Sequence, residues 1–172
     1  VHYGVINTRD YQYMLDSAVS GKGLHLIQNC IRPLPLSQTQ SRENHLILYP
    51  VRAIRRKNIG EIILLSLFTT NKDYIGITLP ALNKSDLKSY EDWKIFAARY
   101  NLPVEFELGL KYDFHELIEK SKYFITTSIM EGFGFTYLEP WTCGRFLFGR
   151  KIPDICFDFT KRGINLNNLY DK

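Results

Sequence analysis

The amino-acid sequence predicts an α/β protein built on a parallel sheet that carries helices on both faces. From His45 onward, short runs rich in β-branched and aromatic residues alternate with segments whose apolar residues recur at helical spacing. Strands that alternate with helices imply right-handed crossovers and a parallel sheet covered on both sides. The length of 172 residues and the hydrophobic content of 45% suit one main folding unit with a sizeable core.

The predicted elements of this sheet follow one another in strict alternation. Strands are predicted at residues 45–49, 74–79, 104–109, 123–130 and 145–149. Helices are predicted between them at residues 59–68, 90–100, 113–120 and 135–142. Ligands of such sheets bind outside the carboxyl ends of the strands, so we expect the chemistry in the turns at 50–52, 110–112 and 131–134.

The first residues of the chain have a different pattern. Residues 1–7 are strand-like, Thr8 can cap a helix that runs to about residue 19, and residues 24–31 form a second apolar strand. Residues 32–41 are rich in proline and polar side chains, which is typical of a linker.

We therefore expect two units in this chain. Residues 1–41 are predicted to hold the end of a preceding N-terminal domain and the interdomain linker, and residues 42–172 to form a second domain. The chain starts at Val1 rather than Met and ends on Lys172 without a clear stop. We expect a piece of a longer protein. Whether the second domain is truncated at its C-terminus is left open.

Composition excludes several classes of protein. No apolar run approaches the roughly 20 residues that span a bilayer, and no signal-peptide layout is present, so we expect a soluble, cytoplasmic protein. The three cysteines are scattered without the paired spacing of a zinc site, which predicts reduced thiols. The net charge of +4 is too small to indicate a nucleic-acid partner.

A glycine turn after the predicted strand at 123–130 is the first candidate site. The apolar run breaks at Gly132 and Gly134 and a helical pattern follows, which leaves backbone N–H groups free for an anion. Glu131 and Glu139 bracket the turn, and carboxylates are suited to accept hydrogen bonds from sugar hydroxyls. A core turn with two surface glutamates is the alternative, and this stretch alone leaves both open.

A run of cations after the first core strand is the second candidate site. Arg52, Arg55, Arg56 and Lys57 lead directly into a predicted helix. Cations at a helix N-terminus oppose the helix dipole, so the arrangement favours an anion bound between them. A solvated charge run is the alternative, and it too stays open for this stretch by itself.

Together the two stretches resemble the C-terminal, donor-binding domain of retaining glycosyltransferases of the GT-B fold, group 1 type. Glu131 and Glu139 match the Glu-x7-Glu motif of that family, and Arg52 and Lys57 match its Arg-x4-Lys spacing. The resemblance covers about residues 45–155. The sequence departs from the family's pattern in three places, which are Asn58 for a glycine, Pro140 for a small residue, and an aromatic stretch at 145–150.

The resemblance implies a Rossmann-like sheet that is one half of a GT-B fold, together with a set of roles. Arg52 and Lys57 would hold the diphosphate of a nucleoside-diphosphate sugar and stabilise the charge on the leaving group. Glu131 would bind sugar hydroxyls, and Glu139 the nucleotide ribose. The resemblance counts Arg52, Lys57 and Glu131 as catalytic, and it counts as donor-binding Gly132, Phe133, Gly134, Glu139, Lys111 and Tyr112.

The resemblance also implies an activity and its partners. The full-length protein would transfer a hexosyl group from the nucleotide sugar to an acceptor, without a cofactor and without a metal, since no Asp-x-Asp motif is present. The acceptor would bind an N-terminal domain of the same protein, so the 172-residue chain alone is expected to be inactive. Peripheral association of the full-length enzyme with a membrane is left open.

Two other functions compete with this one. A non-transferase enzyme for nucleotide sugars, such as an epimerase, could share the architecture, but it would lack these two motifs at these spacings. A nucleotide-binding Rossmann-type module without catalysis is disfavoured because Tyr137 occupies the place of the third glycine in Gly-x-Gly-x-x-Gly.

Overall fold

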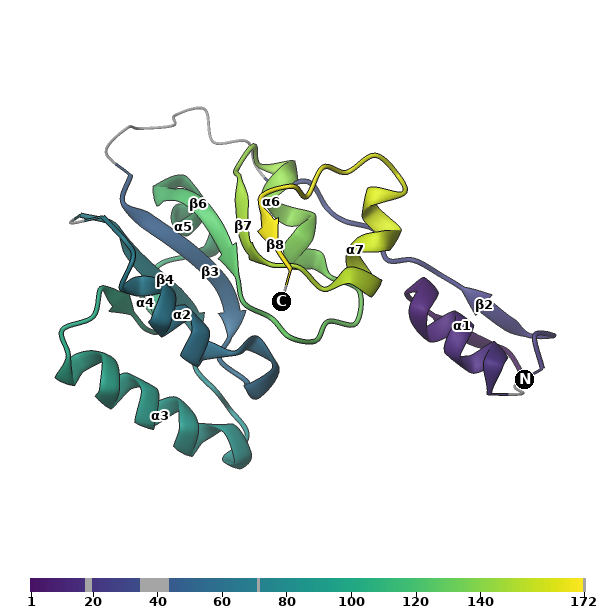
Figure 1. The fold of residues 1–172 in the computed structure, drawn as a ribbon, viewed down its shortest axis with the longest axis horizontal. Coiled ribbons are helices and arrows are strands. Elements are labelled where there is room, and N and C mark those ends of the chain that lie inside the picture. Colours follow the sequence, from purple (N-terminus) through teal and green to yellow (C-terminus); the bar gives the residue numbers. More distant parts are fainter. Residues whose placement is uncertain (18–19, 35–43, 71, 172) are drawn as a thin grey trace.

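The computed structural model describes residues 1–17, 20–34, 44–70 and 72–171, and it has the predicted parallel sheet. Six strands pair in parallel in the order β5-β4-β3-β6-β7-β8, and β1 and β2 form a separate two-stranded parallel sheet (Figure 1). The strands are β1 (Tyr3–Val5), β2 (Leu24–Leu26), β3 (Leu46–Arg52), β4 (Tyr74–Leu79), β5 (Val104–Glu105), β6 (Ser121–Thr126), β7 (Leu147–Arg150) and β8 (Leu169–Tyr170).

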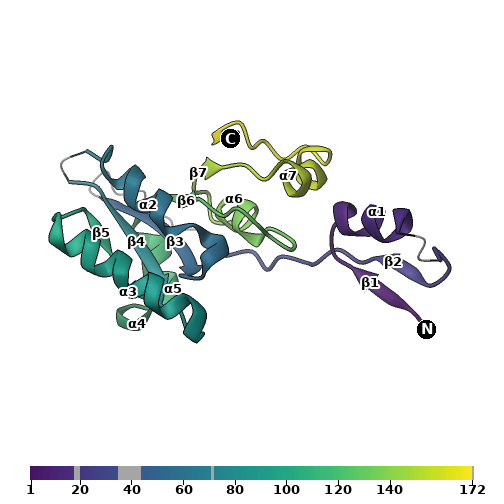
Figure 2. The same ribbon diagram turned by 60° about the horizontal axis from the view of Figure 1, so that its bottom comes forward.

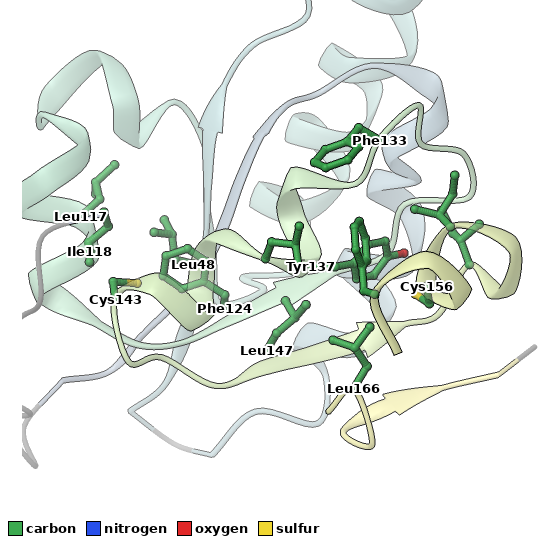
Figure 3. Close-up of a cluster of buried hydrophobic side chains, with 14 of the residues drawn as sticks. Leu48, Leu117, Ile118, Phe124, Phe133, Tyr137, Cys143, Leu147, Cys156 and Leu166 are labelled. Atoms are coloured by element: carbon green, nitrogen blue, oxygen red, sulfur yellow. The ribbon is translucent and has the colours of Figure 1, made fainter. Parts of the chain in front are cut away.

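Helices cover both faces of the large sheet. The side chains of its central strand, β3, point alternately to the two faces and so belong to two apolar cores. Leu46 and Leu48 belong to one apolar cluster with residues of the helices on one face, and part of this cluster is drawn in Figure 3. Ile47 and Tyr49 belong to a second cluster with α2 on the other face. The α-helices are α1 (Thr8–Asp16), α2 (Ile59–Ser66), α3 (Lys84–Arg99), α4 (Leu108–Lys111), α5 (Phe114–Lys120), α6 (Glu139–Thr142) and α7 (Pro153–Thr160), and the 3₁₀ turns are η1 (Arg55–Lys57) and η2 (Phe135–Tyr137).

The strand order creates a switch point between β3 and β6. From β3 the chain builds β4 and β5 on one side, and it then returns to add β6, β7 and β8 on the other side. The connections that leave the carboxyl ends of β3 and β6 run to helices on opposite faces of the sheet, and ligands of such sheets bind at this switch point. Both predicted candidate stretches follow these two strands.

Two predicted elements between β4 and α5 were wrong in their bounds. The helix predicted at 90–100 begins at Lys84, because Asn83 caps it by accepting a hydrogen bond from the N–H of Asp86 at 3.3 Å. The strand predicted at 104–109 ends after two residues, because Glu107 has a left-handed backbone with φ 66° that turns the chain into α4.

The helix predicted at 135–142 is broken into η2 and α6. Pro140 has no N–H, and its ring would clash with the carbonyl of Thr136 in a continuous helix, so the α-helix begins only at Glu139. The sequence reading missed α7 and β8 altogether, although Pro153 at the start of α7 is a recognised helix-start signal. The remaining predicted strands and helices are confirmed to within a few residues.

The N-terminal β1-α1-β2 unit lies beside the large sheet at its α7 side in both views (Figures 1 and 2). Asn7, rather than Thr8, caps α1, and β2 ends at Leu26 instead of residue 31. Of the predicted linker, residues 32–34 form no helix or strand, while residues 35–41 and the predicted domain boundary lie outside the described residues. None of the helices described is long and apolar enough to cross a membrane.

Candidate functional site

A buried ion pair joins the two candidate stretches at the switch point. The Lys57 ammonium donates a short hydrogen bond to Oε1 of Glu131, and the two residues are only 9% and 7% exposed. Arg56 donates from Nη1 to the other carboxylate oxygen of Glu131 at 3.1 Å and to the carbonyl of Met130 at 3.1 Å. Two cations thus surround one carboxylate, which leaves the cluster with a net positive charge.

The backbone around Lys57 is fixed by the strands on both sides. The buried hydroxyl of Tyr49, on β3, donates to the carbonyl of Lys57 at 2.7 Å, and Thr127, just after β6, donates to the same carbonyl at 3.0 Å. The N–H of Ile129 donates to the carbonyl of Arg56 at 2.9 Å. Burial raises the pKa of the Tyr49 hydroxyl, which keeps it protonated as a donor.

Arg52 lies near this cluster along the chain but makes a different contact. As the last residue of β3, it donates from Nη1 to the carbonyl of Pro80 at 3.0 Å. No ion pair of Arg52 occurs in the part of the chain that the structure describes, so its charge remains available to a ligand. The role predicted for Arg52 stays a prediction. The contact between Arg56 and Glu131, which the sequence did not indicate, joins two residues 75 positions apart.

The side chain of Phe133 anchors the glycine turn at residues 131–134. The Phe133 ring is buried and packs edge-on against Phe159 of α7, with 5.6 Å between the ring centres, in the cluster shown in Figure 3. Gly134 has φ +95°, and a Cβ there would lie 2.8 Å from Cγ2 of Ile155. At Gly132, by contrast, the nearest atom to an added Cβ would be Cδ1 of Ile6 at 3.6 Å. The fold therefore requires Gly134 but has room for a side chain at position 132.

The same turn carries backbone donors without partners. Within the described residues, the N–H groups of Gly132, Phe133 and Gly134 make no hydrogen bond to another protein group. Successive free N–H groups in a tight turn form a concave site for an anion. Lys57 and Arg56 lie next to the turn through their contacts with Glu131.

Glu139, the first residue of α6, completes the set of acidic groups. Burial raises the pKa of its carboxyl, and the nearby ammonium of Lys57 opposes that rise. The two predicted glutamates therefore both lie within the field of Lys57. Their predicted roles toward a sugar and a ribose stay predictions.

Lys111 and Tyr112 lie outside this cluster. Both side chains are exposed, and the Lys120 ammonium lies 3.8 Å from the centre of the Tyr112 ring. In the described ranges, no hydrogen bond or ion pair joins either residue to Lys57, Glu131 or the glycine turn. Their predicted contact with a nucleotide base remains to be tested.

A shallow cavity of about 360 Å³ adjoins the charged cluster at the carboxyl edge of the sheet, lined by Ile54, Arg55, Arg56, Asp86, Ile129 and Met130. A cavity of about 390 Å³, bounded in part by Trp141 and Arg145, lies before the start of β7, where strands begin. The charged groups and free N–H donors mark the candidate site, because they provide the chemistry that a ligand requires.

The groups of the candidate site can bind both an anion and hydroxyl groups. Its cations and free backbone donors can hold an oxyanion such as a phosphate, and its two carboxylates can accept hydrogen bonds from hydroxyl groups. Across the described residues, no group of three His, Cys, Asp or Glu side chains is placed to hold a metal ion.

Comparison with known proteins identifies the fold. No family model matches the sequence. The chain is 25% identical to the mannosylglucosyl-3-phosphoglycerate synthase of Petrotoga mobilis, in an alignment that covers all of this chain and 37% of that protein. The chain therefore spans little more than a third of the length of this relative.

Solved structures of glycosyltransferases share its architecture. Anabaena HepE, solved in complex with UDP and glucose, superposes with a TM-score of 0.73 at 15% identity, over 99% of this chain and 49% of HepE. TarM matches with a TM-score of 0.72 at 16% identity, over 99% of this chain and 33% of TarM. A glycosyltransferase from Rickettsia africae matches with a TM-score of 0.70 at 17% identity, over 99% of this chain and 48% of that chain. The chain therefore has the fold of one half of a GT-B glycosyltransferase.

Proposed function

We propose that this chain is the nucleotide-sugar-binding part of a retaining glycosyltransferase that transfers a hexosyl group from a nucleoside-diphosphate sugar to an acceptor. The observation that carries the proposal is the buried contact between Lys57 and Glu131, which brings the two predicted motifs together at the switch point of the sheet. Free N–H groups of the glycine turn lie beside this pair. A diphosphate binds cations and N–H donors, and a sugar binds carboxylate acceptors, so a site for both needs these groups side by side.

The cations have the role that the leaving group demands. Negative charge builds up on the nucleoside diphosphate as its bond to the sugar breaks, and fixed cations and N–H donors lower the energy of that state. Lys57 is held in place by its buried surroundings, and Arg52 can turn from the carbonyl of Pro80 toward a phosphate. Arg56 keeps Glu131 oriented when Lys57 binds the diphosphate.

The glutamates provide the polar contacts to the rest of the donor. Glu131 lies immediately before the glycine turn, so its carboxylate can accept hydrogen bonds from hydroxyls of the sugar next to the diphosphate. Glu139 lies at the start of α6 and would bind the ribose. Phe133 and Gly134 would donate their N–H groups, and Lys111 and Tyr112 would lie nearest the base.

The relatives suggest which nucleotide to test first. HepE was solved with UDP and glucose, and a pneumococcal O-GlcNAc transferase of similar fold was solved with UDP and GlcNAc. The Petrotoga relative is named for a mannosylglucosyl product built on phosphoglycerate. UDP, UDP-glucose and GDP-mannose are therefore the first probes for this chain.

The complete enzyme would need the other half of the fold. Closure of two domains over the donor excludes water and aligns the acceptor, which contributes several kcal/mol of the barrier lowering in enzymes of this kind. We propose that an N-terminal acceptor-binding domain of the same protein supplies that half, in the cytoplasm. The chain alone would bind its donor with a Kd on the order of 10 μM to 1 mM and transfer nothing.

A thermal-shift panel tests this function. We expect UDP, UDP-glucose or another nucleotide sugar to raise the unfolding midpoint of the chain, and NAD to leave it unchanged, because a ligand that binds only the folded state stabilises it. The cavity-lining variant Asn167→Ala, remote from the cluster, serves as a control that should respond like the unmodified chain. A shift with NAD alone would favour the alternative of a nucleotide-binding Rossmann-type module, and no shift with any nucleotide sugar would reject the proposal.

A further inference from the structure

Asn7, in the N-terminal β1-α1-β2 unit, reaches the glycine turn of the candidate site. Its side chain is 1% exposed and donates from Nδ2 to the carbonyl of Gly132 at 2.6 Å, across 125 positions of sequence. The same amide donates to Oδ2 of Asp10 at 2.8 Å, and its Oδ1 accepts from the N–H of Asp10 at 2.7 Å. Asn7 thus caps α1 with its oxygen and holds the glycine turn with its nitrogen.

The contact with Gly132 sets the direction of the next N–H group. In a planar trans peptide, the C=O of Gly132 and the N–H of Phe133 lie in one plane and point in opposite directions. Because Asn7 holds the carbonyl on the α1 side, the N–H of Phe133 points away from α1. That N–H is one of the turn's donors without a protein partner in the described part of the chain.

Contacts with α7 fix the position of Asn7. The N–H of Thr8 donates to Oδ2 of Asp158 on α7 at 2.9 Å, and Asp158 is itself buried. Helix α7 also carries Phe159, which packs against Phe133 of the turn. The start of α1 is therefore bound both to the turn and to the helix that supports the turn.

The turn needs such a restraint because its backbone has glycines at both ends. Gly132 has no Cβ to limit its ψ angle, so the peptide between Gly132 and Phe133 can tilt more easily than one between two residues with side chains once its carbonyl is released. A tilted peptide would turn the N–H of Phe133 away from the anion site, and a phosphate there would lose that donor.

We propose that Asn7 is a positioning residue for the candidate site, which holds the Gly132 carbonyl so that the N–H of Phe133 is directed at the diphosphate of the nucleotide sugar. This inference rests on the proposed function and extends it. The residues before the predicted linker then help to form the donor site, although the two motifs of that site both lie after it.

Two serine variants separate this role from helix capping. Serine is a good N-cap, so Asn7→Ser keeps a cap on α1 and removes the donor to Gly132. Asn83→Ser is the matched control, because Asn83 caps α3 through the N–H of Asp86 in the same Asn-x-x-Asp pattern and does not contact the turn. Titration calorimetry with UDP is expected to show about tenfold weaker binding for Asn7→Ser, the loss of one hydrogen bond to a charged group, and no change for Asn83→Ser.

The amide resonance of Phe133 in two-dimensional NMR gives a readout that needs no ligand. We expect it to move in unliganded Asn7→Ser and to stay in place in Asn83→Ser. UDP binding by Asn7→Ser equal to that of Asn83→Ser, or an unmoved Phe133 resonance, would overturn the inference. If the unmodified chain binds no UDP and no nucleotide sugar, the proposed function fails, and the Phe133 resonance still decides whether Asn7 orients the turn.

Discussion

Replacement of Lys57 by alanine should lower sugar transfer by the full-length protein on the order of 10²-fold, the usual effect of removing a fixed group that stabilises transition-state charge. The ammonium of Lys57 is buried and positioned before the donor arrives, so solvent cannot replace it. Arg52→Ala should cause a similar loss. Steady-state kinetics with saturating acceptor is the measurement, and wild-type rates in both variants would contradict the proposed diphosphate site.

Loss of Lys57 also affects stability, and this needs its own control. Without the ammonium, Glu131 stays buried with Arg56 as its remaining partner, and breaking a buried pair can cost roughly 3–5 kcal/mol of unfolding free energy. Lys122→Ala is the matched control, because Lys122 pairs at 2.6 Å with the buried Asp73 at the opposite, amino edge of the sheet. We expect Lys122→Ala to reduce stability and to retain transfer at the temperature where the protein is folded.

Replacement of each of the two glutamates should remove contacts with a different part of the donor. Glu131→Ala should weaken binding of UDP-glucose about tenfold and leave UDP nearly unchanged, because Glu131 is predicted to contact only the sugar. Glu139→Ala should weaken both ligands by a similar factor, because both contain the ribose. Calorimetry of each variant with the two ligands tests this, and an equal loss of UDP in both variants would show that the division of roles is wrong.

Glu139 also allows a test without ligand, through the pH dependence of stability. Burial raises the pKa of its carboxyl above the ordinary value of 4.5, so the folded state is favoured while the carboxyl is protonated and loses stability as pH rises through the folded pKa. Glu139→Gln should therefore raise the unfolding midpoint at neutral pH and have little effect below pH 4.5, where both side chains are neutral. A destabilised Glu139→Gln at neutral pH would show that the carboxylate is kept for stability and not for a ligand.

Local pattern was sufficient to predict the centre of the fold. The runs that became β3, β4 and β6 are short and apolar, and the residues that α2 buries recur at helical spacing, so these elements lie close to their predicted positions. The predictions were wrong where one residue changes the backbone. Pro140 interrupts a helix whose apolar spacing is otherwise regular, and the left-handed Glu107 ends a strand that its side chains would have continued.

Local sequence pattern likewise predicted part of the site. Lys57 and Glu131 were identified by their spacing within two short motifs, and the structure brings them together. Arg56 was one of several cations in a run, and only the folded chain distinguishes it, by its contact with Glu131. Asn7 carried no signal beyond that of a helix cap, because its contact with Gly132 spans 125 positions and depends on the packing of α1 against α7.

We propose that the edge between β3 and β6 binds the diphosphate of a nucleotide sugar, and amide NMR of the chain during titration with UDP-glucose tests this binding residue by residue. We expect the largest shifts at residues 55–58 and 131–134, around Lys57, Glu131 and the glycine turn. Shifts confined to the remote cavity near Arg145, at the opposite edge of the sheet, would contradict it. So would a spectrum that does not change at millimolar UDP-glucose.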